Sequence, residues 1–172
     1  MPFTIFHLGP ALCFGLPLRK HIHAPTFILA NIIIDFEPLL VLVFGLRYPL
    51  HGYLHTFLMA AFLGLFMGYI MFLLRKPLHR IFRLFLLEEK PINTLKPFLV
   101  AGVLGVIFHV LLDSPLYGDI KPFYPMMVNP LYNPELTSTI YSFCFWTGIL
   151  GTAFYLYIIY QRITRKLANY KS

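Results

Sequence analysis

The sequence predicts an all-α fold: a polytopic membrane helix bundle of about five transmembrane segments, with residues 1–172 forming a single integral membrane domain. The chain is 58% hydrophobic and only 12% charged, with a mean hydropathy of +0.71, whereas soluble domains carry about 25% charged residues. Four apolar runs are long enough to cross a hydrocarbon core of about 30 Å. Short basic clusters separate the runs, as in the loops of membrane proteins.

The apolar runs define the expected helices in chain order. The first segment, residues 3–18, is short and contains Pro10 and Pro17, so it is either a tilted, kinked span or a re-entrant piece. Small residues predict close helix packing in the third segment, at Gly64 and Gly68, and in the last segment, at Gly148 and Gly151. The four longer segments are residues 25–45, 53–74, 97–117 and 136–160.

The basic clusters predict how the chain is oriented. They follow the first, third and fifth segments, so the positive-inside rule places the N-terminus outside and the C-terminus in the cytoplasm. Residues 78–87 mix cations with Ile, Phe and Leu and are expected to lie flat at the membrane interface. The net charge of +7 comes from these clusters, so we expect the lipid bilayer and no nucleic acid as a partner. The oligomeric state stays open.

Ionisable side chains inside the apolar runs are candidates for function, because a charge in hydrocarbon is costly unless it finds a partner. With the expected topology, two carboxylates lie near the middle of the bundle, at Asp35 and Glu37. The others fall in its outer half: His7, His51, His55, His109 and Asp113.

The spacing of the outer residues predicts a metal site. His51 and His55 are four residues apart, as are His109 and Asp113, and residues at this interval share one face of a helix. Histidine pairs at this spacing recur in helical zinc sites. Nitrogen and oxygen ligands without a thiolate favour Zn²⁺, with Mn²⁺, Fe²⁺ or Ni²⁺ as alternatives.

Prolines predict where the helices break. Pro38 lacks an N–H and disfavours helical backbone at the preceding residue, so the second segment is expected to break beside its carboxylates. Asp35 and Glu37 would point about 200° apart on an unbroken helix, and a break lets both approach one site. Pro115 is expected to end or bend the fourth helix. Asn31 is expected to partner Asp35.

Four motifs together resemble a known family. They are M-P-F-T-x-x-H-x-G-P at the start of the chain, D-x-E-P at residues 35–38, H-G-Y-L-H-T at 51–56 and H-V-L-L-D at 109–113. In this order they resemble the prokaryotic family of small membrane-bound proteins described as metal-dependent hydrolases, over residues 1–119. The chain departs from the family pattern H-R-G-x-T-H-S, because Gly52 follows His51 and Leu54 precedes His55. It therefore lacks the Arg of that pattern, an obvious clamp for phosphate or carboxylate.

The resemblance implies a protein of the prokaryotic cytoplasmic (inner) membrane with hydrolase activity. Its expected metal ligands are His7, Asp35, His51, His55, His109 and Asp113.

We expect metal-activated water to attack an ester or phosphoester at the extracytoplasmic side, with a lipid or another membrane-associated molecule as the substrate. Glu37 or Asp35 would act as general base, and Thr56 would orient His55. One alternative is a transporter of metal ions or protons, because intramembrane His and Asp beside a broken helix also mark ion pathways. Another is a non-catalytic protein that the metal only stabilises. Residues 65–74 and 99–106 lack His and carboxylates, which argues against a conduit.

Overall fold

A computed structural model describes residues 5–88 and 90–171, and among these residues every regular element is a helix. The all-α prediction is therefore confirmed for this part of the chain. Residues 1–4, which begin the first motif and include the start of the expected first segment, lie outside the described residues. The elements are α1 (Ile5–Gly15), η1 (Pro17–Lys20), α2 (Ala24–Ile33), α3 (Phe36–Phe44), η2 (Tyr53–His55), α4 (Phe57–Leu73), α5 (Arg75–Leu84), α6 (Lys96–Asp113), η3 (Pro134–Leu136) and α7 (Thr137–Lys171).

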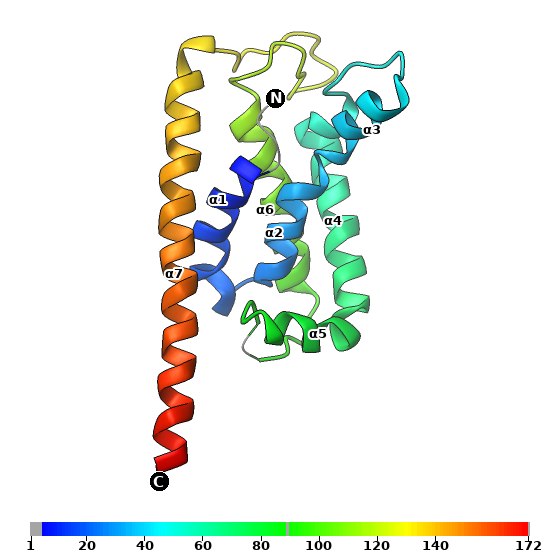
Figure 1. Cartoon of the computed structure of the whole chain (residues 1–172). Helices are drawn as coiled ribbons and strands as arrows, with labels where there is room; N and C mark the ends of the chain where they lie inside the picture. Colours follow the sequence, from blue (N-terminus) through cyan, green and yellow to red (C-terminus); the bar gives the residue numbers. More distant parts are fainter. Residues whose placement is uncertain (1–4, 89, 172) are drawn as a thin grey trace.

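The chain runs back and forth between two ends of a bundle (Figure 1). α1, α4 and α7 run in one direction, and α2, α3 and α6 return in the other. We call the upper end, with the loops 45–56 and 114–136, the loop end. We call the lower end, with η1, α5 and the C-terminal part of α7, the basic end.

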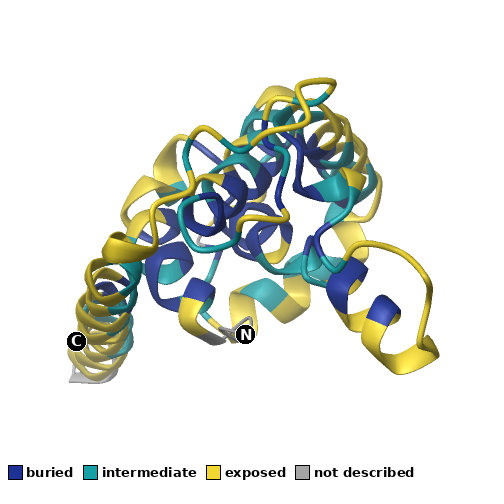
Figure 2. Ribbon diagram, turned by 90° about the horizontal axis from the view of Figure 1, so that it is seen from above, coloured by how far each residue is buried: buried dark blue, intermediate teal, exposed yellow. Residues whose placement is uncertain are grey.

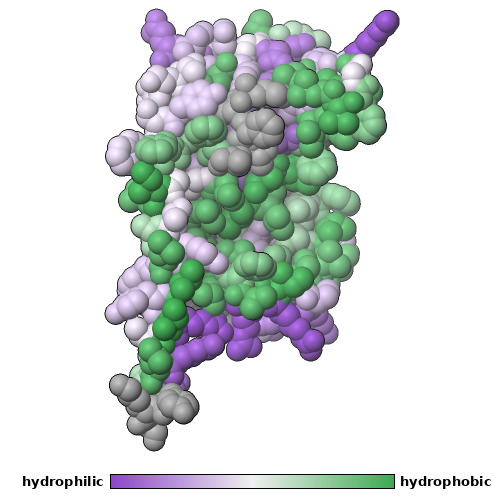
Figure 3. All heavy atoms as spheres, viewed as in Figure 1, coloured by the Kyte–Doolittle hydropathy of each residue, from purple (hydrophilic) through white to green (hydrophobic). Residues whose placement is uncertain are grey.

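Several helices are able to cross a membrane. Ala24–Phe44, Lys96–Asp113 and Pro134–Asn169 are long and apolar enough, and α4 joined to α5 would make a fourth span. The expected count of about five is not confirmed, since α1 has only 11 residues and therefore extends about 17 Å. Apolar residues cover the middle of the face in Figure 3 and hydrophilic residues cover its two ends, an arrangement compatible with a membrane protein.

Helix boundaries follow local chemistry. α4 begins at Phe57, later than expected, because the Thr56 side chain caps it by accepting a hydrogen bond from the Met59 N–H at 3.2 Å. α6 ends two residues before Pro115, as the proline predicts. α7 continues to Lys171, beyond the expected end at residue 160, because the residues that follow include many good helix formers.

The second span breaks beside its carboxylates, which confirms the prediction from Pro38. α2 ends at Ile33 and α3 begins at Phe36. Across the break, the Glu37 N–H donates to the Ile34 carbonyl at 3.2 Å, the oxygen that Pro38 has no N–H to reach. The break places Asp35 at the junction of the two helices.

α5 turns away from α4 by 88° and crosses the basic end (Figure 1). It begins three residues before the segment expected at the membrane interface and mixes cations with apolar side chains in the same way. This orientation is the one expected of an interfacial helix.

Glycines let the helices approach closely, as their spacing predicts. A Cβ at Gly64 of α4 would lie 2.7 Å from the Gly102 carbonyl oxygen of α6, and one at Gly151 of α7 would lie 2.8 Å from the Cys13 nitrogen of α1. Viewed from the loop end, buried residues gather inside the bundle, whereas the helix that leads to the C-terminus is mostly exposed (Figure 2). The core includes Phe27, Ile28, Ala30, Ile34, Ala60, Ala101, Val106 and Val110.

Candidate metal centre

Four of the expected ligands meet inside the bundle toward its loop end. Asp35 comes from the α2–α3 junction, His55 from η2, and His109 and Asp113 from the last turns of α6. Each offers one ligand atom, and these atoms all lie within 4.8 Å of one another. The two histidines and Asp113 are buried, and Asp35 is half-buried. We call this group the four-residue centre.

The geometry of the His109 ring favours a positive charge at the centre. Its Nδ1 lies 2.6 Å from the backbone carbonyl oxygen of Asn31, which only accepts, so Nδ1 carries the proton. Nε2 of the neutral ring is then a lone pair, and it lies 3.3 Å from Asp35 Oδ1 and 3.3 Å from Asp113 Oδ2. A lone pair that faces two carboxylates is repelled unless a proton or a metal ion lies between them.

The His55 ring is held in the same tautomer. Its Nδ1–H donates to Glu37 Oε2 at 2.9 Å, which leaves Nε2 as the ligand atom. Among the described residues, the buried atoms His55 Nε2 and His109 Nε2 have no hydrogen-bond partner. Because buried polar atoms are normally hydrogen-bonded, this cluster of lone pairs points to a shared cation.

The distances and donor types fit a metal ion. With metal–ligand distances near 2.1 Å, the ligands of a tetrahedral ion lie about 3.4 Å apart, close to the 3.3 Å that separates His109 Nε2 from each carboxylate. Two nitrogen and two oxygen donors suit several divalent ions, zinc among them. The four-residue centre can therefore hold a metal ion, and its donors alone do not select which one.

His7 borders the centre. Its Nε2 lies 3.0 Å from Asp113 Oδ1, and its ring stacks on the His109 ring with centroids 4.1 Å apart. It is not part of the group whose atoms all lie within 4.8 Å, and it contacts the centre through Asp113 and His109. Its other ring nitrogen, Nδ1, has no hydrogen-bond partner among the described residues.

His51 lies farther out, against the loop that follows α6. Its Nδ1–H donates to both Asp119 oxygens at 3.0 Å, and its backbone N–H donates to Asp119 Oδ2 at 3.3 Å. The expectation that His51 and His55 share a helical face is wrong, because both precede α4. Their rings still meet edge to face, with centroids 4.8 Å apart. Burial lowers the pKa of His51, which favours its neutral form.

Glu37 organises the loop that carries the histidine pair. Besides the His55 ring, it accepts hydrogen bonds from the Gly52 N–H at 3.1 Å, the Leu54 N–H at 3.2 Å and the Tyr48 hydroxyl at 3.3 Å. A carboxylate that holds a ligand histidine in this way fixes its tautomer and orientation. The geometry therefore makes Glu37 a positioning residue for His55.

One further expectation needs correction. Thr56 does not orient His55, because its hydroxyl donates to the Tyr53 carbonyl at 2.9 Å while it caps α4. Asn31 has a role that the sequence did not predict: its backbone carbonyl accepts from the His109 ring, and its side chain donates to the Gly105 carbonyl at 3.2 Å.

Asp119 is the contact that the sequence alone did not reveal. It lies in the loop that follows α6, where it accepts hydrogen bonds from both the ring and the backbone of His51. The two residues are 68 positions apart, and no helical spacing connects them. Only the path of the loop after α6 brings them together.

A pocket of about 260 Å³ opens at the loop end, and both His51 and Asp119 line it. Among the described residues that line it, Lys121 is the one lysine or arginine. Polar and aromatic groups make up much of the rest: Tyr48, His51, Tyr53, Thr56, Asp119 and Tyr124. The pocket therefore offers a cation and aromatic surfaces next to His51, whose ring contacts that of His55.

No family model, no curated protein and no solved structure matches the chain. The resemblance to metal-dependent hydrolases consequently rests on the sequence motifs.

Proposed function

We propose that the chain is a membrane-embedded hydrolase that holds a divalent metal at the four-residue centre and cleaves an ester or phosphoester at the loop end. The observation that carries the proposal is the convergence of two fixed imidazole lone pairs and two carboxylates within 4.8 Å. The order of the motifs along the chain supports hydrolysis as the activity.

The side chains in and around the centre have distinct roles in this reaction. When bound, a divalent ion supplies a hydroxide by lowering the pKa of a bound water toward 7. Glu37 and the Asn31 carbonyl hold His55 and His109 with Nε2 toward the centre. The Asp35 side chain is 16% exposed, against 3% for Asp113. We therefore assign His55, His109 and Asp113 as the ligands that would hold the ion, which leaves a position for water, and Asp35 as the base that would take the proton from that water.

The adjoining pocket suggests the substrate class. The Lys121 ammonium can bind an anionic group, such as the phosphate of a phosphoester, and so replace the arginine that the family pattern would supply. Exposed Tyr53 and Met127 line the same pocket and suit an apolar portion of the substrate. We propose a lipid or another membrane-associated ester, with Zn²⁺ as the metal and the loop end on the extracytoplasmic side.

Metal analysis tests the centre directly. The full chain is purified in detergent with added Zn²⁺ and without chelators, and its metal content is measured beside His55→Ala and Asp113→Asn. We expect about one ion per chain in the unaltered protein and a loss in both variants. His21→Ala is the matched control, because His21 is exposed and far in sequence from the centre.

A panel of phosphoesters and carboxylesters then tests the activity. Turnover that follows the metal content across the variants supports the hydrolase. Absence of metal from the unaltered protein would disprove the centre, and bound metal without turnover of any ester would leave it a structural site.

A further inference from the structure

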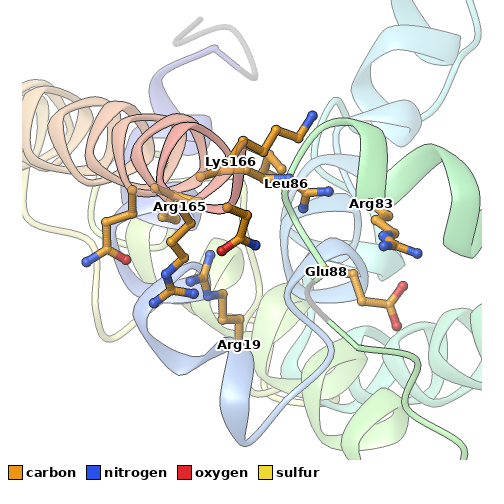
Figure 4. A pocket seen from close by; sticks show the side chains of 10 residues that line it. Arg19, Arg83, Leu86, Glu88, Arg165 and Lys166 are labelled. Carbon is orange, nitrogen blue, oxygen red and sulfur yellow. The ribbon is translucent and has the colours of Figure 1, made fainter. Parts of the chain in front are cut away.

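A second pocket, of about 310 Å³, lies at the basic end. Cations from three elements surround it, and Figure 4 shows several of them. Arg19 comes from η1, Arg83 from α5, and the others from the C-terminal part of α7. Those from α7 are Arg162, Arg165 and Lys166.

The cations outnumber the acidic groups around this pocket. Among the described residues that line it, Glu88 is the one carboxylate. Glu88 is buried and already has partners: it accepts from His79 Nδ1 at 2.9 Å and from the Ile92 N–H at 3.3 Å. An anion is therefore the ligand that this charge distribution favours.

The pocket also has an apolar side. Ile158, which is buried, lies one helical turn before Arg162 on α7, and Leu86 lines the same pocket. The apolar part therefore lies toward the middle of the molecule, and the cations lie at its hydrophilic lower end (Figure 3). A ligand that matches both parts has an anionic head and an apolar tail.

The backbone at Leu86 is held in an unusual conformation, as is common in binding sites. Leu86 follows α5 with φ = 58°, in a position where helices usually place glycine, and a side chain costs on the order of 1 kcal/mol or more there. The preceding carbonyl, of Phe85, accepts a hydrogen bond from the Tyr155 hydroxyl of α7 at 2.7 Å. The turn is thus fixed against α7, and it keeps an apolar side chain at the pocket.

We propose that this pocket binds the phosphate headgroup of an anionic phospholipid from the leaflet at the basic end. The arginines receive the phosphate, because their guanidinium groups match its geometry, and the acyl chains lie along the apolar surface beside Ile158. Basic pockets between membrane helices are known to bind such headgroups. The bound lipid would bridge η1, α5 and α7. This site is separate from the four-residue centre and does not depend on the proposed hydrolase activity.

Native mass spectrometry of the full chain in detergent tests the proposal, with phosphatidylglycerol, phosphatidylcholine and inorganic phosphate as probes. We expect phosphatidylglycerol to be retained in preference to phosphatidylcholine, and added salt to weaken it. An equal retention of both lipids would overturn the proposal. So would displacement of phosphatidylglycerol by inorganic phosphate at an equal concentration, because the pocket would then be a site for free anions. These measurements need no variant.

Two charge-matched triple variants locate the site. Arg19→Gln, Arg162→Gln and Arg165→Gln together remove three cations of the pocket. Lys20→Gln, Lys76→Gln and Arg80→Gln remove three exposed cations from the basic end outside its lining. We expect the first set to weaken phosphatidylglycerol binding by roughly a hundredfold, about fivefold for each cation, and the second set much less. Equal losses in both sets would refute a defined site.

Discussion

Replacement of Glu37 by glutamine tests how the centre is assembled. In the structure, Oε2 accepts from the His55 ring at 2.9 Å and the Gly52 N–H at 3.1 Å, and Oε1 accepts from the Leu54 N–H and the Tyr48 hydroxyl. Glutamine has one acceptor oxygen and one NH₂ group. Whichever way the amide is turned, its NH₂ group faces donors.

The expected cost follows from these contacts. A hydrogen bond to a charged group contributes about 1.5 to 3 kcal/mol, and loss of an outer-shell partner of a metal-binding histidine lowers metal affinity about 10- to 100-fold. We therefore expect Glu37→Gln to weaken Zn²⁺ binding by about 10- to 100-fold, or roughly 1.4 to 2.7 kcal/mol. His55→Ala removes the ligand itself and should lower the affinity further.

Competition with a chromogenic chelator measures these affinities on the detergent-solubilised protein. Glu135→Gln is the matched control, because it makes the same chemical change at an exposed residue of the loop end. If Glu37→Gln kept the affinity of the unaltered protein while His55→Ala lost it, the positioning role of Glu37 would be refuted. An equal loss in Glu135→Gln would show a non-specific charge effect.

Further predictions concern stability. Burial, followed by the charge of His79, lowers the pKa of His23 to about 4 from about 6.5 in the unfolded chain, so His23 contributes stability above pH 6.5 that is lost as the pH falls toward 4. His23→Asn keeps a side chain that can cap α2 but does not titrate in this range. It should therefore remove about 2 kcal/mol of the loss in unfolding free energy between pH 6.5 and pH 5. Thermal unfolding in the presence of a chelator measures this difference, and an unchanged pH profile in the variant would contradict the role of His23. Gly64→Ala should cost about 1 to 3 kcal/mol, because its Cβ would lie 2.7 Å from the Gly102 carbonyl oxygen, whereas Gly148→Ala meets its nearest atom at 3.7 Å and should be tolerated. Equal unfolding temperatures for the two alanine variants would refute the close α4–α6 contact.

The sequence predicted the parts of the centre that depend on helices. His109 and Asp113 lie one turn apart on α6, and Pro38 marks the break that brings Asp35 to them. These relations are local, because helical periodicity and the missing proline N–H act within a few residues. The helix bundle could be predicted for the same reason, since composition and hydrophobic run length are properties of short segments.

The loop contacts could not be predicted in this way. His51 and Asp119 meet only because the loops before α4 and after α6 fold against each other. Likewise, Glu37 holds His55 and the Asn31 carbonyl holds His109 only because these groups meet across the bundle. Spacing along the chain contains no information about such contacts, so ligand types were predicted better than the residues that position them.

Transport through the bundle is the strongest rival function, and the packing between its two buried polar clusters tests it. Besides the centre, His23 and Thr26 are buried toward the basic end. Thr26 lies five residues from Asn31, about 7.5 Å along α2, and an apolar cluster that includes Phe27, Ile28 and Ala101 packs there. An ion would have to cross this layer without partners, which is costly in an apolar interior. We therefore expect proteoliposomes with the unaltered protein to show no more proton or Zn²⁺ flux than those with His55→Ala; a flux that His55→Ala abolishes would show that the layer opens and would assign the centre to transport.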